Sequence, residues 1–199
     1  HEYFLEDVKT KEPLLALYKS KVAYYDDYRE KIQVRKVMSR DIVSSFEIKL
    51  VFQKPVMLQW DPEGEKLALG LDYDIHKREG QSVLRIYHAG NKNPIGKIRT
   101  YNELQGFQWI NSSEFAYGLD DNSLIFGKIK GDTLVNTDTT SVLDTKRQTV
   151  KYDNIKLDLM KGKDKTTLVS YDNLSGKIKL WDLSTHKTTG SIPVSKASV

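Results

Sequence analysis

Cysteine is absent from the 199-residue sequence, which excludes disulfides, thiolate catalysis and cysteine-ligated zinc or iron–sulfur clusters. Long apolar runs are also lacking, since stretches such as Pro13–Leu17 fall far short of the roughly 20 residues that a membrane-spanning helix needs. Neither sign of charge dominates, because 31 Lys and Arg oppose 27 Asp and Glu for a net charge of +4. We therefore expect a soluble intracellular protein, nuclear or cytoplasmic, with no membrane insertion and no cofactor.

Short runs of strand-forming residues fill the chain between frequent turn signals. Runs such as Val83–Tyr87 and Ile178–Trp181 are rich in β-branched and aromatic residues, and turns such as Asp61–Gly64 separate them. Strands of four to seven residues at roughly ten-residue spacing are typical of an all-β protein. This pattern excludes a parallel α/β sheet.

A repeat appears when these strands are aligned with one another. The segment Val56–Gly70 recurs as Leu104–Gly118, and a looser third copy starts at Leu157. We align Leu58, Phe107 and Leu159, which are spaced by 49 and 52 residues. Four strands per repeat on a period near 50 residues predict β-propeller blades, at approximately residues 2–50, 51–101, 102–148 and 149–199.

Two of these copies carry recognisable motifs. Gly176–Lys187 contains Trp181-Asp182 at the end of a third strand, and Trp60–Gly64 forms a Trp-Asp-Pro-Glu-Gly hairpin. These residues resemble the WD40-repeat family, which implies a propeller that presents loops and blade edges to other proteins. The Trp-Asp position reads differently in the other copies, and the family's Asp before the third strand is kept only as Asp121. We therefore do not expect the family's buried Asp–His–Ser–Trp hydrogen-bond network. The residue pairs at the Trp-Asp position of the other copies are Arg35-Lys36, Tyr87-His88 and Gly127-Lys128.

The number of blades and the fold of the first blade leave alternatives open. Four blades fill the chain, so it is a fragment of a longer propeller, receives blades from a partner, or closes with four; we favour a fragment or an incomplete propeller. An open end would leave an unpaired strand edge for docking. For residues 13–38 the strand pattern is favoured over an amphipathic helix, with first-blade strands expected at Leu14–Leu17, Lys21–Tyr25, Lys31–Val37 and Ile42–Ile48.

Some side chains have the composition of chemical sites. Asp72, Asp74 and His76, with Glu79 behind them, have spacing that suits a metal, although a solvated loop explains them better. Trp60, Trp109 and Trp181 occupy repeat positions, which favours the core over a ligand cage. The pairs Asp26-Asp27 and Asp120-Asp121 fall where hairpin turns use carboxylates to accept hydrogen bonds from their own backbone.

Tyr and Arg beside turns have the composition of protein-binding hot spots. We expect the loops Asp26–Lys31, Asp72–Gln81 and Asp120–Ser123 to form one binding rim. The predicted partner-binding residues are Tyr25, Tyr28, Arg29, Tyr73, His76, Lys77, Arg78, Asp120 and Tyr171.

The expected function is a noncatalytic scaffold, a WD40-like subunit of an intracellular multiprotein complex whose partners are other protein subunits. One alternative is a nucleic-acid-associated subunit of a nuclear complex, which would use the basic loops Lys146-Arg147 and Lys161–Lys165. Another is a propeller hydrolase with a carboxylate or metal site.

Overall fold

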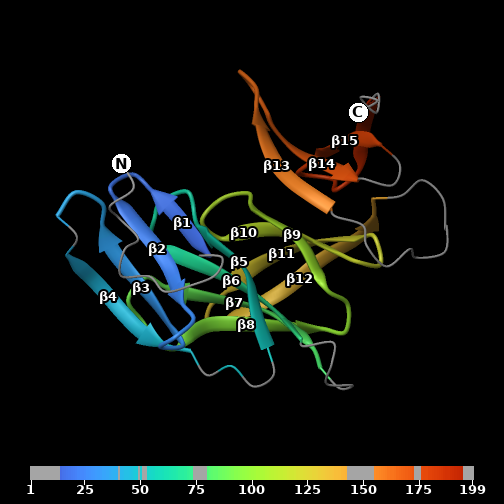
Figure 1. Ribbon diagram of the computed structural model, residues 1–199. Helices are drawn as coiled ribbons and strands as arrows, with labels where there is room; N and C mark the ends of the chain where they lie inside the picture. The colour runs from blue at the N-terminus through green and yellow to red at the C-terminus, as the bar shows by residue number, and fades with distance from the viewer. Residues whose placement is uncertain are drawn as a thin grey trace, which may run out of the picture. The chain divides into compact units, whose positions relative to one another are not determined.

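The computed structural model describes residues 14–39, 41–48, 50, 53–73, 80–142, 155–172 and 176–194, which form four separate antiparallel sheets of four strands each (Figure 1). The first sheet contains β1 Leu15–Tyr18, β2 Lys21–Asp26, β3 Lys31–Lys36 and β4 Ile42–Glu47. The second contains β5 Gln53–Trp60, β6 Lys66–Tyr73, β7 Ser82–His88 and β8 Pro94–Thr100. The third contains β9 Leu104–Trp109, β10 Glu114–Leu119, β11 Ser123–Lys130 and β12 Thr133–Ser141. The fourth contains β13 Ile155–Lys161, β14 Thr166–Asp172, β15 Lys177–Asp182 and β16 Thr188–Pro193.

Within each sheet the strands lie in chain order, as in a propeller blade. This confirms the all-β prediction with four strands per repeat. The first sheet covers the segment for which a helix was the alternative, so the helical interpretation is wrong. The described residues contain no helix that is long and apolar enough to span a membrane.

Two compact units make up the structure, and we describe each by itself. The first comprises residues up to Tyr101 together with Gly131–Thr133, and the second comprises Asn102–Lys130 and the residues from Leu134 onward. The first unit therefore holds the sheets β1–β4 and β5–β8.

Aromatic packing joins the two sheets of the first unit. The indole Nε1 of Trp60, on β5, donates a hydrogen bond to the carbonyl oxygen of Ala16, on β1, at 3.1 Å. The Trp60 ring lies 6.2 Å from the Tyr18 ring, centroid to centroid. All five residues of β6 from Leu67 to Leu71 are buried. Trp60 is thus a core residue, as the repeat predicted.

A close approach of β9 to β13 brings together the two sheets of the second unit. A Cβ on Gly106 would lie 2.3 Å from the carbonyl oxygen of Ile155, so only glycine fits there. Trp181, from β15, packs with Phe126 and Ile155 in one buried cluster. Trp109 and Trp181 are both fully buried, which confirms that they are core residues.

Part of the family's buried hydrogen-bond network is present in the last blade, contrary to our expectation. Trp181 Nε1 donates to Ser170 Oγ at 2.8 Å, and both residues are buried. The prediction was wrong for this pair because it rested on the residues that differ from the family in the other copies. Ser170 lies on β14 and Trp181 on β15, and their hydrogen bond requires none of those residues.

Asp182, the second residue of the Trp-Asp motif, organises the turn that follows β15. Its carboxylate accepts hydrogen bonds from the backbone N–H of Ser184 and Thr185, each at 2.9 Å, and from the Lys165 ammonium group. The Lys165 hydrogen bond, followed by those from Ser184 and Thr185, holds the Asp182 pKa well below its usual value.

The alignment of the third copy needs a correction of two residues. In the strand register Leu58 pairs with Leu69, and Phe107 pairs with Tyr117. The residue of the last sheet that is equivalent to Leu58 and Phe107 is Leu157, which pairs with Ser170. Leu159 is instead equivalent to Trp60 and Trp109. The corrected spacings from Leu58 through Phe107 to Leu157 are 49 and 50 residues, so the repeat is more regular than the sequence alignment indicated.

Gly64 provides a test of the packing in the first unit. Its φ is +71°, and a Cβ there would lie 2.0 Å from the Tyr18 ring. Gly64→Ala is expected to lower the free energy of unfolding by about 3 kcal/mol, because the left-handed backbone is strained and Tyr18 must leave Trp60. Gly131→Ala is the matched control, since Gly131 has φ +60° but nothing within 4 Å of its Cβ. That variant is expected to lose only about 1 kcal/mol. Equal losses in denaturant titrations followed by tryptophan fluorescence would refute the packing argument.

Candidate functional site

The hairpin turn between β2 and β3, one of the predicted binding loops, is held by a buried carboxylate. Asp26 ends β2 and is only 5% exposed. Its Oδ1 accepts a hydrogen bond from the backbone N–H of Arg29 at 3.1 Å, and its Oδ2 lies 3.4 Å from the Arg29 guanidinium Nη1. The carboxylate therefore fixes both the turn and the direction of the arginine, which confirms the turn role predicted for Asp26.

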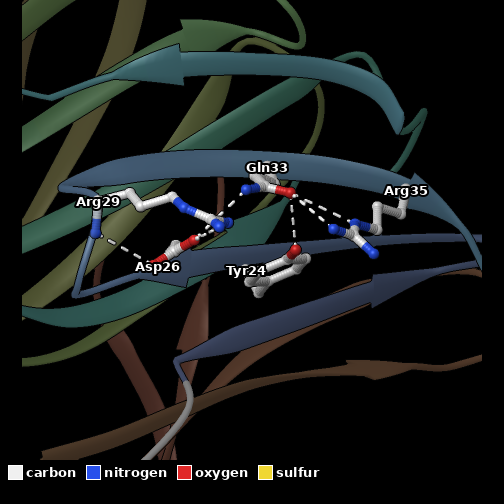
Figure 2. Close-up of polar contacts among 5 residues, drawn as sticks. All are labelled: Tyr24, Asp26, Arg29, Gln33 and Arg35. Carbon is white, nitrogen blue, oxygen red and sulfur yellow. Dashed lines mark hydrogen bonds and ion pairs between the residues drawn. The ribbon is translucent and has the colours of Figure 1, made fainter. Parts of the chain in front are cut away.

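A buried amide connects this turn to the middle of the sheet (Figure 2). Gln33 Nε2 donates to Asp26 Oδ2 at 3.4 Å, and Gln33 Oε1 accepts from the Tyr24 hydroxyl at 2.7 Å. Arg35 donates to the same Oε1 from Nε at 3.3 Å and from Nη2 at 3.2 Å. Only this orientation of the amide suits a carboxylate on one side and three donor groups on the other.

Alternation along β2 and β3 decides on which face this network lies. Ala23 and Tyr25 belong to the core that packs on the second sheet. Tyr24, Gln33 and Arg35 alternate with core residues, so they share the opposite face of the first sheet. The Arg35 guanidinium also lies over the Tyr24 ring, 5.7 Å from its centroid.

Two large side chains project at the tip of this hairpin. Tyr28 is 82% exposed, and the Arg29 side chain is 56% exposed although the Asp26 carboxylate holds it. An arginine whose direction is already fixed loses little conformational freedom on binding. The site can form aromatic and charge-assisted contacts with a protein.

Tyr25, also predicted to contact a partner, lies in the core instead. It is only 5% exposed and packs in the cluster between the first two sheets. The prediction missed this because Val22–Tyr25 is uninterrupted by polar residues, so alternation does not show which ring points inward. Burial, together with the negative charges of Asp27, Glu30 and Asp26, raises the pKa of Tyr25 to about 12.

The other predicted binding residues divide into three groups. Tyr73, at the end of β6, and Tyr171, on β14, are half-buried. His76, Lys77 and Arg78 lie outside the described residues. Asp120 is half-buried and accepts a hydrogen bond from the backbone N–H of Glu103 at 3.1 Å.

The carboxylate pair in the third sheet stabilises backbone, as predicted for a turn. Asp121 Oδ1 accepts from the backbone N–H of Ser123 at 2.9 Å, and its Oδ2 accepts from the Asn102 amide at 2.6 Å. Asp120 Oδ1 accepts from the backbone N–H of Glu103, the residue before β9. Both carboxylates are thus engaged in local structure.

The predicted metal constellation is only partly within the described residues. Asp72 lies on β6, while Asp74, His76 and Glu79 lie outside them. Among the residues whose placement is described, no three or more His, Asp or Glu side chains are grouped as a metal site requires.

Tyr24, Gln33 and Arg35 support the site but were not predicted. A polar residue within a strand, such as Gln33, has the sequence pattern of a solvent-facing residue. Their only signal is the register, which places Tyr24 directly opposite Gln33. That register becomes readable once the hairpin turn Asp27–Glu30 is assigned.

Comparison with known proteins gives a likeness in structure alone. No protein-family model matches the sequence, and no curated protein does. The KlHsv2 structure in which loop 6CD is replaced by a Gly-Ser linker matches with a TM-score of 0.65 at 10% identity, covering 90% of this chain and 58% of that one. The β-propeller domain of Cps50 (Swd1) from Myceliophteria thermophila matches with a TM-score of 0.65 at 11% identity, covering 92% and 55%. Sqt1 from Saccharomyces cerevisiae matches with a TM-score of 0.61 at 13% identity, covering 93% and 49%.

These matches establish the fold class. The chain has the fold of β-propeller blades, the fold that the sequence resemblance implied. It spans about half the length of the solved structures that it matches.

Two buried tyrosines make stability sensitive to alkaline pH. The pKa values of Tyr25 and Tyr117 are both raised from 10.0 to about 12, chiefly by burial. A raised pKa stabilises the fold fully below pH 10, and this contribution is lost as pH rises from 10 to 12. The free energy of unfolding should therefore fall steeply in this window, and less steeply in a Tyr25→Phe/Tyr117→Phe variant. Denaturant titrations at pH 9, 10, 11 and 12 measure the difference, and equal slopes would contradict it.

Proposed function

We propose that this chain is a noncatalytic protein-interaction module that acts as a scaffold subunit of an intracellular multiprotein complex, in the nucleus or cytoplasm. Its partners are other protein subunits. The turns that join the second and third strands of the sheets capture them, with Tyr28 and Arg29 as principal contacts. The β-propeller fold supports this proposal because such blades present loops on a rigid scaffold.

The observation that carries the proposal is the anchored tip of the β2–β3 hairpin. Asp26 is buried and binds Arg29 through both backbone and guanidinium, while Tyr28 next to it is almost fully exposed. A buried carboxylate that orients an exposed arginine is a costly arrangement for a mere solubilising loop. Tyr and Arg are also the residue types most enriched among interface hot spots.

The two alternative functions gain less support. Of the basic loop residues expected to contact nucleic acid, Lys146 and Arg147 lie outside the described residues, and Lys165 is ion-paired with Asp182. A hydrolase would need convergent acid and base groups. The carboxylates of Asp26, Asp120 and Asp121 instead hold backbone turns.

The test is affinity capture with the immobilised chain from a cell extract, quantified by mass spectrometry. Tyr28→Ala/Arg29→Ala should reduce the proteins retained by the wild-type chain about tenfold or more, because each hot-spot residue contributes roughly 1–2 kcal/mol or more. Its melting temperature should stay within a few degrees of the wild-type value, since both side chains are exposed and the Asp26 carboxylate keeps its hydrogen bonds from the Arg29 backbone N–H and from Gln33. Nuclease treatment of the extract should leave the captured set unchanged.

Lys156→Ala/Met160→Ala is the matched control, because it removes one exposed cation and one exposed large side chain from β13. This control should retain the wild-type set of proteins. Retention of the same set by the Tyr28→Ala/Arg29→Ala variant would overturn the proposed site. Capture that disappears after nuclease treatment would favour the nucleic-acid alternative.

A further inference from the structure

The outer hairpin of the second sheet, β7–β8, differs in charge from the other three outer hairpins. Residues 80–102 contain Arg85, Lys92, Lys97 and Arg99 but no Asp or Glu. Each of the other outer hairpins includes at least one carboxylate: Asp41 and Glu47 in β3–β4, Asp132 and Asp138 in β11–β12, and Asp182 in β15–β16. A one-sign hairpin is therefore a local feature of this blade and not a property of the repeat.

Three of these cations are exposed and uncompensated. Lys92, Lys97 and Arg99 are exposed, and none forms an ion pair or side-chain hydrogen bond within the described part of the chain. Arg85 is different, because its Nη2 donates to Gln53 Oε1 at 3.2 Å. Lys97 stands opposite Arg85 in the strand register, so like charges face one another across β7 and β8. This arrangement is unfavourable unless a negative group joins it.

The backbone at this position is also able to bind a strand. β8 is the last strand of its sheet and pairs only with β7 among the described strands. The outer side of such a strand offers backbone N–H and C=O groups at strand spacing. Lys97 and Arg99 are two residues apart, so they project on the same side of the strand about 7 Å from each other.

A groove lies beside the turn of this hairpin. Its volume is about 700 Å³, and β4 of the first sheet and the turn before β8 line it. Phe46 gives the groove an apolar side chain, and Lys92 belongs to both the groove and the basic hairpin. The lining residues are Ser45, Phe46, Glu47, Gly90, Asn91 and Lys92.

We propose that the β8 edge binds an extended acidic segment of a partner protein, which adds to the second sheet as a fifth strand. Backbone hydrogen bonds along β8 supply the pairing, and carboxylates at alternate positions of the segment meet Lys97 and Arg99. The inference names a partner class for the interaction module, so it rests on the proposed function, but it uses a different surface from the β2–β3 turn. A polypeptide is favoured over nucleic acid because only a polypeptide satisfies the open backbone edge.

Lysines on an edge strand can also serve to protect a sheet from aggregation, and this protective role predicts a different effect of charge reversal on peptide binding. Glutamate on an edge strand repels a second copy as well as lysine does. Lys97→Glu/Arg99→Glu therefore keeps the protection but reverses the charge that attracts an acidic segment. A purely protective role predicts no change in binding from this variant.

The experiment measures fluorescence anisotropy of a labelled, capped ten-residue peptide of alternating Glu and Val or Thr, titrated with the full chain at about 50 mM salt. The wild-type chain should bind it, and Lys97→Glu/Arg99→Glu should weaken binding at least tenfold. Lys128→Glu/Lys130→Glu, the same charge change on β11, should stay within twofold. A peptide in which proline replaces two central residues should bind at least tenfold more weakly, because proline has no backbone N–H to donate to an edge strand. Hydrogen exchange should slow at β8 backbone amides when the first peptide is present.

Three results would overturn the proposal. These are no binding by the wild-type chain, equal binding by the wild-type and Lys97→Glu/Arg99→Glu chains, and equal binding of the alternating and proline-containing peptides. A single-stranded oligonucleotide that binds more tightly than the alternating peptide would also overturn it in favour of a polyanion site. Tyr28→Ala/Arg29→Ala should bind the peptide like the wild-type chain, so failure of the edge site and failure of the turn site are separately visible.

Discussion

Burial of both faces of the middle strands is the constraint on which the rest of the structure depends. Every residue of β6 from Leu67 to Leu71 is buried, and so is every residue of β10 from Phe115 to Leu119. Strands buried on both faces read as continuous apolar runs without alternation. The fourth strands, such as β8 and β16, are more exposed than these middle strands. Side chains available for contacts therefore gather at the turns and along the outer edges.

The position that Trp181 occupies in the last sheet holds a different residue in each of the other sheets. Arg35, Tyr87, Gly127 and Trp181 occupy equivalent places, each opposite the same point of the second strand. Trp181 bonds to a serine, Tyr87 packs against a ring of the neighbouring sheet, and Arg35 bonds to a buried amide. At Gly127 the ring comes from the adjacent strand, since Phe115 fills the space that a Cβ would need. Each blade thus fills one site with different chemistry.

Strands and turns were predictable from the sequence because their signals are local. The period of about 50 residues and turn residues such as Asp26 located all four sheets. The face of β2 that points into the core was not predictable, because Val22–Tyr25 places apolar or aromatic residues on both faces of the strand. Only the strand register shows that Tyr25 points into the core and Tyr24 points to the opposite face. The network around Gln33 was also hidden. A buried glutamine and an exposed one look the same until the opposite strand is known.

The two proposed surfaces, the β2–β3 turn and the β8 edge, differ in charge compensation. Asp26 lies 3.4 Å from the Arg29 guanidinium, so this arginine brings little uncompensated charge to the turn, and its contribution is fixed geometry. Lys97 and Arg99 have no such carboxylate within the residues described, so their field extends into solvent and weakens with salt. The edge is therefore suited to attracting an acidic segment at long range. The turn is suited to discriminating between partners once contact is made, because Asp26 fixes the direction of Arg29 and an arginine of fixed direction fits few shapes.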